Sequence, residues 1–297
     1  MEMETNNTPA IEFHKVFLNY DDKLVLSDIN FKLDRGEMIF MTGVSGSGKS
    51  VLLRLAIALE HPDSGQVLIE GQDVGSWSEV ELLNLRGNRM GIVFQEDSLF
   101  TGMSVYENVA FRLVEHGVDE QEVGRQVSEV LKFVGLYQDA QKLPYELSGG
   151  MRRRLEIARA LVGWPSIMLF DEPASGLDPL TAAQVLDLII RARDIYGIST
   201  IYVTKKLDEI PYLANHRAKK TDNDVVIERA TGESGPRARV IVLAHGEIIF
   251  AGSVEEFETS NLPEVTRLTK AYNGTVFSDF LTTDPWDKHR QPLERVL

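Results

Sequence analysis

Short apolar runs alternate with helix-like segments along most of the chain. Five runs rich in Val, Ile, Leu, Met and Phe predict buried strands, at residues 38–42, 91–94, 167–170, 200–203 and 240–243. Residues 50–59, 104–136 and 182–196 carry apolar positions at helical spacing. This alternation predicts an α/β core built on a parallel sheet.

The segments outside this alternation predict other structures. Residues 11–17 and 24–33 predict two strands joined by a polar turn near Asp21, and residues 67–70 predict another strand. Residues 217–239 are polar and of mixed charge, which predicts an inserted loop or hairpin. Residues 260–297 have a helical first half and a proline-punctuated end, and we expect them to pack on the domain surface.

The composition of the chain excludes several classes of function. With 43% hydrophobic and 26% charged residues in 297, it is typical of one or two globular domains. A formal net charge of −14 argues against broad electrostatic binding of nucleic acid or anionic lipid. The absence of cysteine excludes disulfides, thiolate metal sites and a cysteine nucleophile. No secretory signal and no membrane-spanning run is predicted, so we expect any membrane role to depend on a partner.

The strongest chemical motif lies at residues 43–50, which read GVSGSGKS and match G-x-x-x-x-G-K-[ST] in full. Glycines let the backbone wrap a polyphosphate, with amide groups and the start of the next helix facing it. The residues expected to hold the phosphates are Gly43, Ser45, Gly46, Gly48 and Lys49, with the hydroxyl of Ser50 on Mg²⁺. A flexible linker is the alternative, but a linker would not be framed by a strand and a helix.

A second motif ends the apolar run at residues 167–170 with two carboxylates. Such a strand can deliver Asp171 beside the phosphate loop, where it would hold Mg²⁺ through water. Glu172 would then polarise the attacking water as a general base. An acidic turn that caps the next helix is the alternative, and the phosphate loop upstream favours the catalytic interpretation.

The segment LSGGM at residues 147–151 resembles the LSGGQ signature of the ATP-binding-cassette (ABC) ATPases, and the resemblance runs from about residue 11 to residue 257. In that family the segment contacts the γ-phosphate of ATP bound to the other subunit. The resemblance therefore implies a role in trans for Ser148, Gly149 and Gly150. A helix N-cap at Ser148 without a ligand is the alternative, which explains the serine but not the glycines. The basic residues 152–154 that follow are interpreted as a solvated helix face or a surface for a partner.

The resemblance implies a fold and a domain organisation. ABC cassettes are α/β P-loop NTPases with a mostly parallel RecA-like core sheet, an N-terminal antiparallel β-subdomain and a helical signature subdomain. We accordingly expect a loose N-terminus over residues 1–10 and an ATPase domain over 11–258. The helical subdomain is expected at about 98–160, the insertion at 217–239 and a C-terminal extension at 259–297.

Three further residues match family positions. Tyr20 precedes Lys49 by 29 residues, where the family keeps an aromatic that stacks on adenine. A half-buried strand tyrosine is the alternative. Gln95 matches the glutamine that ligates Mg²⁺ and senses the membrane partner. Asp178 matches the loop that crosses the dimer interface, and a helix N-cap at this residue is compatible with that role.

One position departs from the family. After the strand at residues 200–203 the family has His and often Asp, whereas this chain has Lys205 and Lys206. That His contacts the γ-phosphate and helps to hold the water and the glutamate. Lysine can donate a charge-assisted hydrogen bond to phosphate, but it is longer and more flexible. We expect ATP binding to be kept and hydrolysis to be slowed. The alternative is two solvated lysines, with the γ-phosphate contact supplied elsewhere.

The amino-acid sequence around the motifs is similar to that of the Mla and Mce phospholipid-transport ATPases, including Met151 in place of the usual Gln. This resemblance implies a homodimer of ATPase subunits bound to an integral-membrane permease, with an MCE-domain protein on the far side. It places the chain on the cytoplasmic face of the inner membrane, held there by the permease. A permease helix is expected in a groove near Gln95 and residues 100–109.

Other functions stay open beside lipid transport. The first is an ABC transporter for another cargo. The second is an ABC ATPase that acts on DNA or ribosomes, which the short segment between Gln95 and Ser148, the single cassette and the negative charge disfavour. The third is a catalytically weak regulatory cassette, for which Lys205 is the argument.

Overall fold

The computed structural model describes residues 8–221, 225–230 and 236–272. Its strands are β1 (Ile11–Tyr20), β2 (Lys23–Leu33), β3 (Met38–Thr42), β4 (Ser64–Ile69), β5 (Gln72–Asp73), β6 (Met90–Val93), β7 (Ile167–Asp171), β8 (Ser199–Val203), β9 (His216–Lys220), β10 (Val225–Arg229), β11 (Ala238–Ala244) and β12 (Glu247–Ser253). Its helices are α1 (Lys49–Ala56), α2 (Glu79–Asn88), α3 (Val105–Glu115), α4 (Glu120–Phe133), α5 (Gly149–Leu161), α6 (Pro179–Tyr196), α7 (Glu209–Asn215), α8 (Val254–Glu258) and α9 (Pro263–Tyr272).

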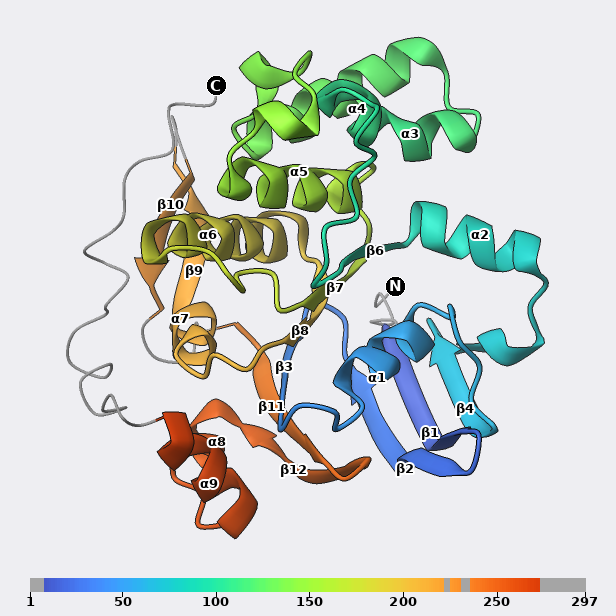
Figure 1. The fold of residues 1–297 in the computed structure, drawn as a ribbon, viewed down its shortest axis with the longest axis vertical. Coiled ribbons are helices and arrows are strands. Elements are labelled where there is room, and N and C mark those ends of the chain that lie inside the picture. Colours follow the sequence, from blue (N-terminus) through green and yellow to red (C-terminus); the bar gives the residue numbers. More distant parts are fainter. Residues whose placement is uncertain (1–7, 222–224, 231–235, 273–297) are drawn as a thin grey trace, which may run out of the picture.

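A six-stranded sheet forms the centre of the molecule, in the order β12-β11-β3-β8-β7-β6 (Figure 1). All neighbouring pairs are parallel except β11 with β12, which is an antiparallel hairpin. The parallel strands are buried on both faces, which explains why they appear in the sequence as continuous apolar runs. The mostly parallel core sheet predicted from these runs is therefore confirmed.

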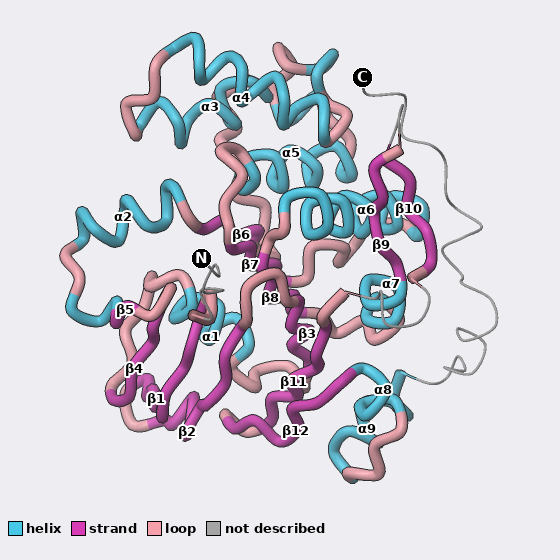
Figure 2. Tube along the Cα trace, turned by 180° about the vertical axis from the view of Figure 1, so that it is seen from behind, coloured by secondary structure: helices cyan, strands magenta, loops and turns pink. Residues whose placement is uncertain are grey.

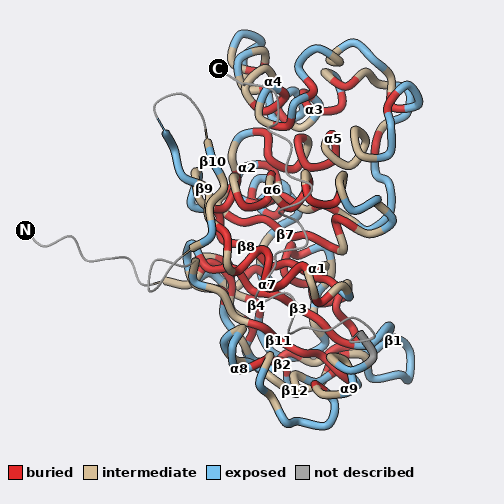
Figure 3. The backbone as a smooth tube through the Cα atoms, turned by 90° about the vertical axis from the view of Figure 1, so that its left-hand side faces the viewer, coloured by how far each residue is buried: buried red, intermediate tan, exposed pale blue. Residues whose placement is uncertain are grey.

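Alternate residues of each parallel strand enter different cores. Phe40 and Phe170 pack on the side of α5 and α6, whereas Ile39 and Leu169 pack on the side of α1 and the small sheet. Successive side chains of a strand point to opposite faces, so a single sheet joins the two cores. The buried residues form a band through the sheet and the helices beside it (Figure 3).

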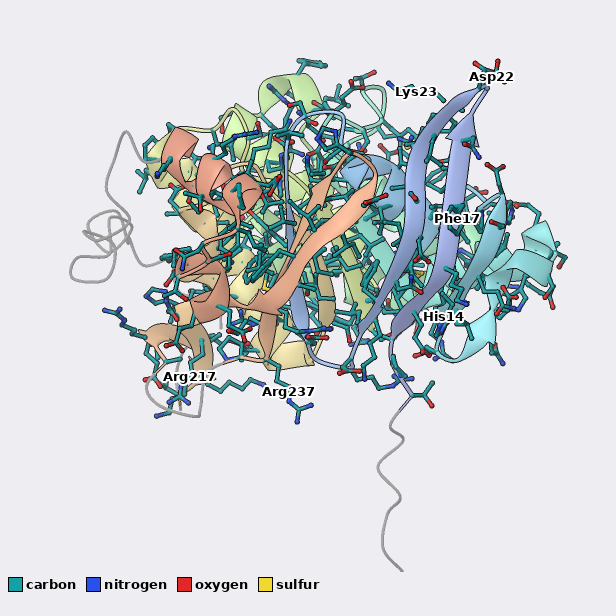
Figure 4. The ribbon with its side chains drawn as sticks, turned by 90° about the horizontal axis from the view of Figure 1, so that it is seen from below. His14, Phe17, Asp22, Lys23, Arg217 and Arg237 are labelled. Carbon is teal, nitrogen blue, oxygen red and sulfur yellow. The ribbon has the colours of Figure 1, made fainter. Side chains whose placement is uncertain are left out.

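The N-terminal strands form a separate antiparallel sheet in the order β2-β1-β4-β5. The β1–β2 pair runs from Ile11 opposite Leu33 to Tyr20 opposite Lys23, so the predicted polar turn lies at the tip of a hairpin. Figure 4 places Asp22 at this tip, away from the body of the molecule. Residues 1–7 of the expected loose N-terminus lie outside the described residues, and Ala10 already belongs to the core, where it is 1% exposed.

Helices α3, α4 and α5 gather at the end of the molecule opposite the small sheet (Figures 1 and 2). The side chain of Ser104 caps α3 in a reciprocal pair with Glu107. Buried valines and a leucine at helical spacing along α4 pack this helix on the others. The predicted helical segment at residues 104–136 thus consists of two helices joined by a turn.

The structures of the polar region at residues 217–239 and of the C-terminal extension agree in part with the prediction. Residues 216–220 and 225–229 pair as an antiparallel hairpin beside α6, which is the hairpin of the predicted loop or hairpin. Residues 222–224 and 231–235 lie outside the described residues. Arg217, in β9, lies at the side of the molecule in Figure 4. Val265 of α9 is fully buried in the larger core. The first half of the extension therefore packs on the domain, and residues 273–297 lie outside the description.

Candidate active site

Four predicted functional segments follow neighbouring strands of the central sheet. The phosphate loop follows β3, Lys205 follows β8, Glu172 follows β7 and Gln95 follows β6. Because β3, β8, β7 and β6 are parallel neighbours, their carboxyl ends lie at one edge of the sheet. Ligands of open α/β sheets bind at such an edge.

A cavity of about 330 Å³ opens at this edge. It is lined by Val25, Ser45, Gly46, Gly48, Lys49, Ser50, Val51, Arg54, Gln95, Glu172 and Lys205. The fold therefore brings together most of the predicted phosphate-loop residues, the predicted base, the predicted glutamine and the unusual lysine. Val25 and Arg54 were not predicted, because neither belongs to a motif.

The phosphate loop has a backbone that only glycine fits well. Gly43 has a φ of 143°, and a β-carbon there would lie 2.0 Å from the carbonyl oxygen of Leu243. Gly48, the N-cap of α1, has a φ of 102°. A β-carbon at Gly48 would lie 2.7 Å from a methyl group of Leu26. The loop is thereby fixed against β2 and β11.

Lys49 is buried beneath this loop and binds the loop itself. Its ammonium donates to the carbonyl oxygens of Gly43 and Val44, each at 2.8 Å, and to the hydroxyl of Ser47 at 3.3 Å. Burial, and then the positive charge of Lys205, lower the pKa of Lys49 to about 8. A phosphate between the two lysines would add a negative charge beside both ammonium groups.

The donor set beside Lys49 fits a magnesium ion. The carboxylate of Asp171 is 6% exposed, and within the described structure its Oδ1 atom is buried without a hydrogen-bond partner. Burial raises the pKa of Asp171, and a hydrogen bond from the Ser50 hydroxyl opposes that rise. A carboxylate and a hydroxyl with free lone pairs are the oxygen ligands that Mg²⁺ takes beside phosphate. Such an ion would neutralise phosphate charge.

Glu172 and Lys205 form an ion pair across the mouth of the cavity. The Lys205 ammonium lies 2.6 Å from the Glu172 carboxylate, and the two side chains are 43% and 11% exposed. Glu172 has a φ of 49°, a left-handed backbone that non-glycine residues adopt uncommonly. In this structure the predicted base is therefore occupied by the lysine that replaces the family's histidine.

The loop that carries Lys205 is anchored by a buried carboxylate. Glu209 is 1% exposed and accepts hydrogen bonds from the hydroxyls of Tyr202, at 2.8 Å, and Thr204, at 2.7 Å. Thr204 in turn accepts the backbone N–H of Lys206 at 2.9 Å. The Lys206 ammonium donates to the carbonyl of Ala174 at 3.1 Å. Both lysines thus bind the segment that begins at Glu172, and neither is merely solvated.

Tyr20 lies near the cavity but does not line it. Its hydroxyl donates to Glu60 and accepts a hydrogen bond from Arg54 at 3.0 Å, and its side chain lies at the end of β1 with 39% of the residue exposed. Arg54 connects Tyr20 to the rim of the cavity. Stacking of Tyr20 on adenine stays a prediction.

The signature segment does not reach this cavity within one chain. Ser148 caps α5 by accepting the N–H of Met151, and α5 lies apart from α1 (Figures 1 and 2). A β-carbon at Gly150 would lie 2.3 Å from a methyl group of Thr181, which is itself bound to Asp178. The signature and the Asp178 loop, both predicted to act in trans, are therefore adjacent.

The basic residues after the signature bind the chain itself, so they are not merely a solvated helix face, and their interpretation as a surface for a partner stays a prediction. Arg152 donates to the carbonyl of Leu147, Arg153 to that of Phe94 and Arg154 to that of Val134. Guanidinium groups are wide enough to join loops that are distant in sequence, which the local sequence cannot reveal.

Comparisons with known proteins agree with this geometry. The family description "ABC transporter" matches residues 26–175. A methionine import ATP-binding protein of Leifsonia xyli is 36% identical over 269 residues, which cover 90% of this chain and 71% of the relative.

The chain belongs to the ABC transporter family, as an ATP-hydrolysing subunit.

Other relatives have the same architecture. A methionine import ATP-binding protein of Staphylococcus epidermidis is 36% identical over 225 residues, and this chain spans 65% of its length. The dimeric structure of a bacterial ABC transporter cassette has a TM-score of 0.68 at 27% identity and covers 82% of this chain and 98% of that one. A further structure of that cassette is a post-hydrolysis state bound to ADP and phosphate. A subunit of the cbiONQ complex of Clostridium perfringens has a TM-score of 0.71 at 27% identity, covering 89% and 99%.

These matches confirm the cassette fold predicted from the signature. The relatives named above are methionine import ATP-binding proteins and not phospholipid transporters. The predicted membership of the Mla and Mce branch is therefore not supported. Among the described residues, none of the helices has both the length and the apolar character that crossing a membrane requires.

Replacement of Lys205 by alanine tests its role. We expect Lys205→Ala to lower the turnover number about tenfold, because a charge-assisted contact to the γ-phosphate is lost. ATP affinity should change less, since Lys49 remains in the cavity. Steady-state ATP hydrolysis and nucleotide titration measure both quantities. Lys219→Ala, at an exposed lysine of β9, is the matched control. Equal turnover in the parent and Lys205→Ala would remove Lys205 from the reaction.

The anchor of the Lys205 loop should titrate near neutral pH. Burial raises the pKa of Glu209 from its ordinary value of 4.5 to about 7, so between these values the folded chain binds the proton more tightly than the unfolded chain. Stability therefore falls as pH rises above about 4.5 and levels off once pH exceeds the folded value, with a loss of about 1 kcal/mol between about pH 6 and about pH 8. Urea unfolding of the parent and Glu209→Gln at both pH values measures this component, which the variant should lack. An identical pH dependence in both proteins would contradict the assignment.

Proposed function

We propose that this chain is the ATP-driven motor subunit of an ABC transporter for a small molecule, and that it acts as a homodimer. The separation of the signature helix from the phosphate loop carries this proposal. One chain offers a phosphate loop, a candidate base and a candidate magnesium site, but its signature segment lies elsewhere. A second copy placed face to face would supply that segment to the same nucleotide, in line with a solved relative described as dimeric.

Within the proposed dimer each site residue has a chemical role. Lys49 and the loop glycines bind the β- and γ-phosphates, while Ser50, Gln95 and Asp171 hold Mg²⁺. Glu172 orients and deprotonates the attacking water. This last role requires Glu172 to leave Lys205, and a γ-phosphate is the anion to which Lys205 would turn instead. Ser148 and Asp178 of the other copy complete the site.

The partner and the location follow from the same proposal. An integral-membrane permease would hold the chain on the cytoplasmic face of the membrane and contact the segment after Gln95. Phe111 and Val114 expose 37% and 58% of their area on α3, beside that segment, which favours an apolar contact there. We keep the boundaries 11–258 for the ATPase domain and 259–297 for the extension as part of the proposal.

The names of the relatives favour a cargo other than phospholipid. Relatives from four genera, at 35–39% identity, are methionine importers. This supports the alternative interpretation of the sequence, a transporter for another cargo, and does not support an MCE-domain partner. Methionine is the cargo that we propose.

A trapped dimer tests the motor function. We expect Glu172→Gln to bind ATP without turnover and to accumulate as a dimer with ATP and Mg²⁺, because the γ-phosphate contacts stay intact. Size-exclusion chromatography with light scattering detects the dimer. Lys49→Ala added to Glu172→Gln removes the phosphate contact and should return the monomer. Full turnover by the parent as a strict monomer, or a failure to bind ATP, would contradict the proposal.

A transport assay tests the cargo. The chain, co-purified with its permease and reconstituted in liposomes, should move labelled methionine in an ATP-dependent manner and leave labelled phospholipid in place. The Glu172→Gln complex is the control for hydrolysis. ATP-dependent movement of phospholipid instead would restore the original interpretation of the sequence, while the motor function would stand.

A further inference from the structure

The segment that carries Gln95 is held by the helix that begins at the signature. This segment, residues 94–100, is the first part of the connection between β6 and α3 and is called here the Gln95 segment. Three side chains of α5 bind its backbone. Arg153 donates to the carbonyl oxygens of Phe94, at 2.8 Å, and Gln95, at 3.1 Å. Glu156 accepts the N–H of Ser98 at 3.1 Å, and Arg159 donates to the carbonyl of Ser98 at 2.5 Å.

Arg153 and Glu156 also bind each other. Their charged groups lie 2.6 Å apart, and their side chains are only 11% and 5% exposed. A buried carboxylate is costly unless it is paired, and Arg153 is the charged partner of Glu156. A pair of the same type and spacing on α4, Arg125 with Glu122, is 62% and 40% exposed and binds no loop. The burial of the Arg153–Glu156 pair therefore serves the Gln95 segment rather than the helix.

We propose that Arg153 and Glu156 are positioning residues that fasten the Gln95 segment to the signature helix. The two ends of this unit then move together. Gln95 lines the cavity of its own chain, whereas Ser148 lies at the other end of the unit, away from that cavity. This inference rests on the proposed function, because in the proposed dimer Ser148 belongs to the site of the other copy. A shift of Gln95 at the nucleotide of its own chain is thereby transmitted, through the Arg153–Glu156 pair and α5, to Ser148 at the nucleotide of the other copy.

The link makes a distinctive kinetic prediction. Neither Arg153 nor Glu156 lines the cavity, so the affinity of one chain for ATP should not depend on them. Assembly of the two sites in the transition state should depend on them, because Gln95 and Ser148 must be placed at the same time. We expect Arg153→Ala to lower the turnover number about tenfold with ATP affinity within about twofold of the parent.

The experiment compares matched variants of the full chain. Hydrogen–deuterium exchange of residues 94–100 should be faster in Arg153→Ala than in the parent, because the segment loses the side chain that holds Phe94 and Gln95. Arg125→Ala, which breaks the exposed pairs with Glu122 and Glu129, should change neither exchange nor turnover. Glu156→Gln keeps an acceptor for the Ser98 N–H and should retain most of the turnover. If Arg153→Ala does not fold, Arg153→Met combined with Glu156→Met removes both charges and takes its place.

The outcomes separate this inference from the proposed function. Faster exchange with unchanged turnover in Arg153→Ala would overturn the positioning role, as would unchanged exchange. An equal loss of turnover in Arg125→Ala would also overturn it, because the effect would then be one of general stability. A parent protein that does not hydrolyse ATP would contradict the proposed function, while the exchange comparison would still decide whether the link exists.

Discussion

Parallel pairing of β3 with β8 and of β8 with β7 is the constraint on which the rest of the structure depends. It sets the phosphate loop, Lys205 and Glu172 side by side at one edge of the sheet, although they lie far apart in the sequence. The pairing is fixed because alternate residues of each strand must enter different cores. A slip of one residue would exchange the two faces and put these three segments out of alignment.

The charges at this edge explain how an acidic protein can offer a site for an anionic ligand. The net charge of the whole chain is −14, yet two lysines face the cavity. In the described structure these lysines are compensated internally, Lys49 by loop carbonyls and Lys205 by Glu172. A triphosphate with magnesium would replace the loop carbonyls as partner of Lys49 and Glu172 as partner of Lys205. Glu172 would then be free to act on the attacking water. Local arrangement, and not net charge, therefore decides what this protein binds.

How much could be predicted from the sequence depended on how local the responsible contacts are. The phosphate loop and the strand that ends at Asp171 are continuous segments, and their positions followed from motif and periodicity. Helix α2 was missed because it exposes Val80 and Leu83 and so lacks a clear apolar face, although Ser78 and Glu81 form a capping box that could have indicated it. The pairing of Lys205 with Glu172 and the contacts of Arg153 with Phe94 and of Arg154 with Val134 join segments that are distant in sequence, so no local pattern indicates them.

The lysine at position 205 and the Arg153–Glu156 pair would both affect the step in which two copies assemble the ATP site. An ATPase whose site is completed by a second copy has to keep its base from activating water before that copy arrives. In the proposed dimer the Lys205–Glu172 ion pair would occupy the predicted base until a γ-phosphate draws Lys205 away, so this contact would break in every cycle. The Arg153–Glu156 pair does the opposite, since it keeps Gln95 and the signature helix in a fixed relation that needs no rearrangement when the sites meet. In this proposal the Lys205–Glu172 pair breaks during the cycle, whereas the Arg153–Glu156 pair stays formed. The exposure of the two basic side chains fits this difference, since that of Lys205 is 43% exposed and that of Arg153 is 11% exposed.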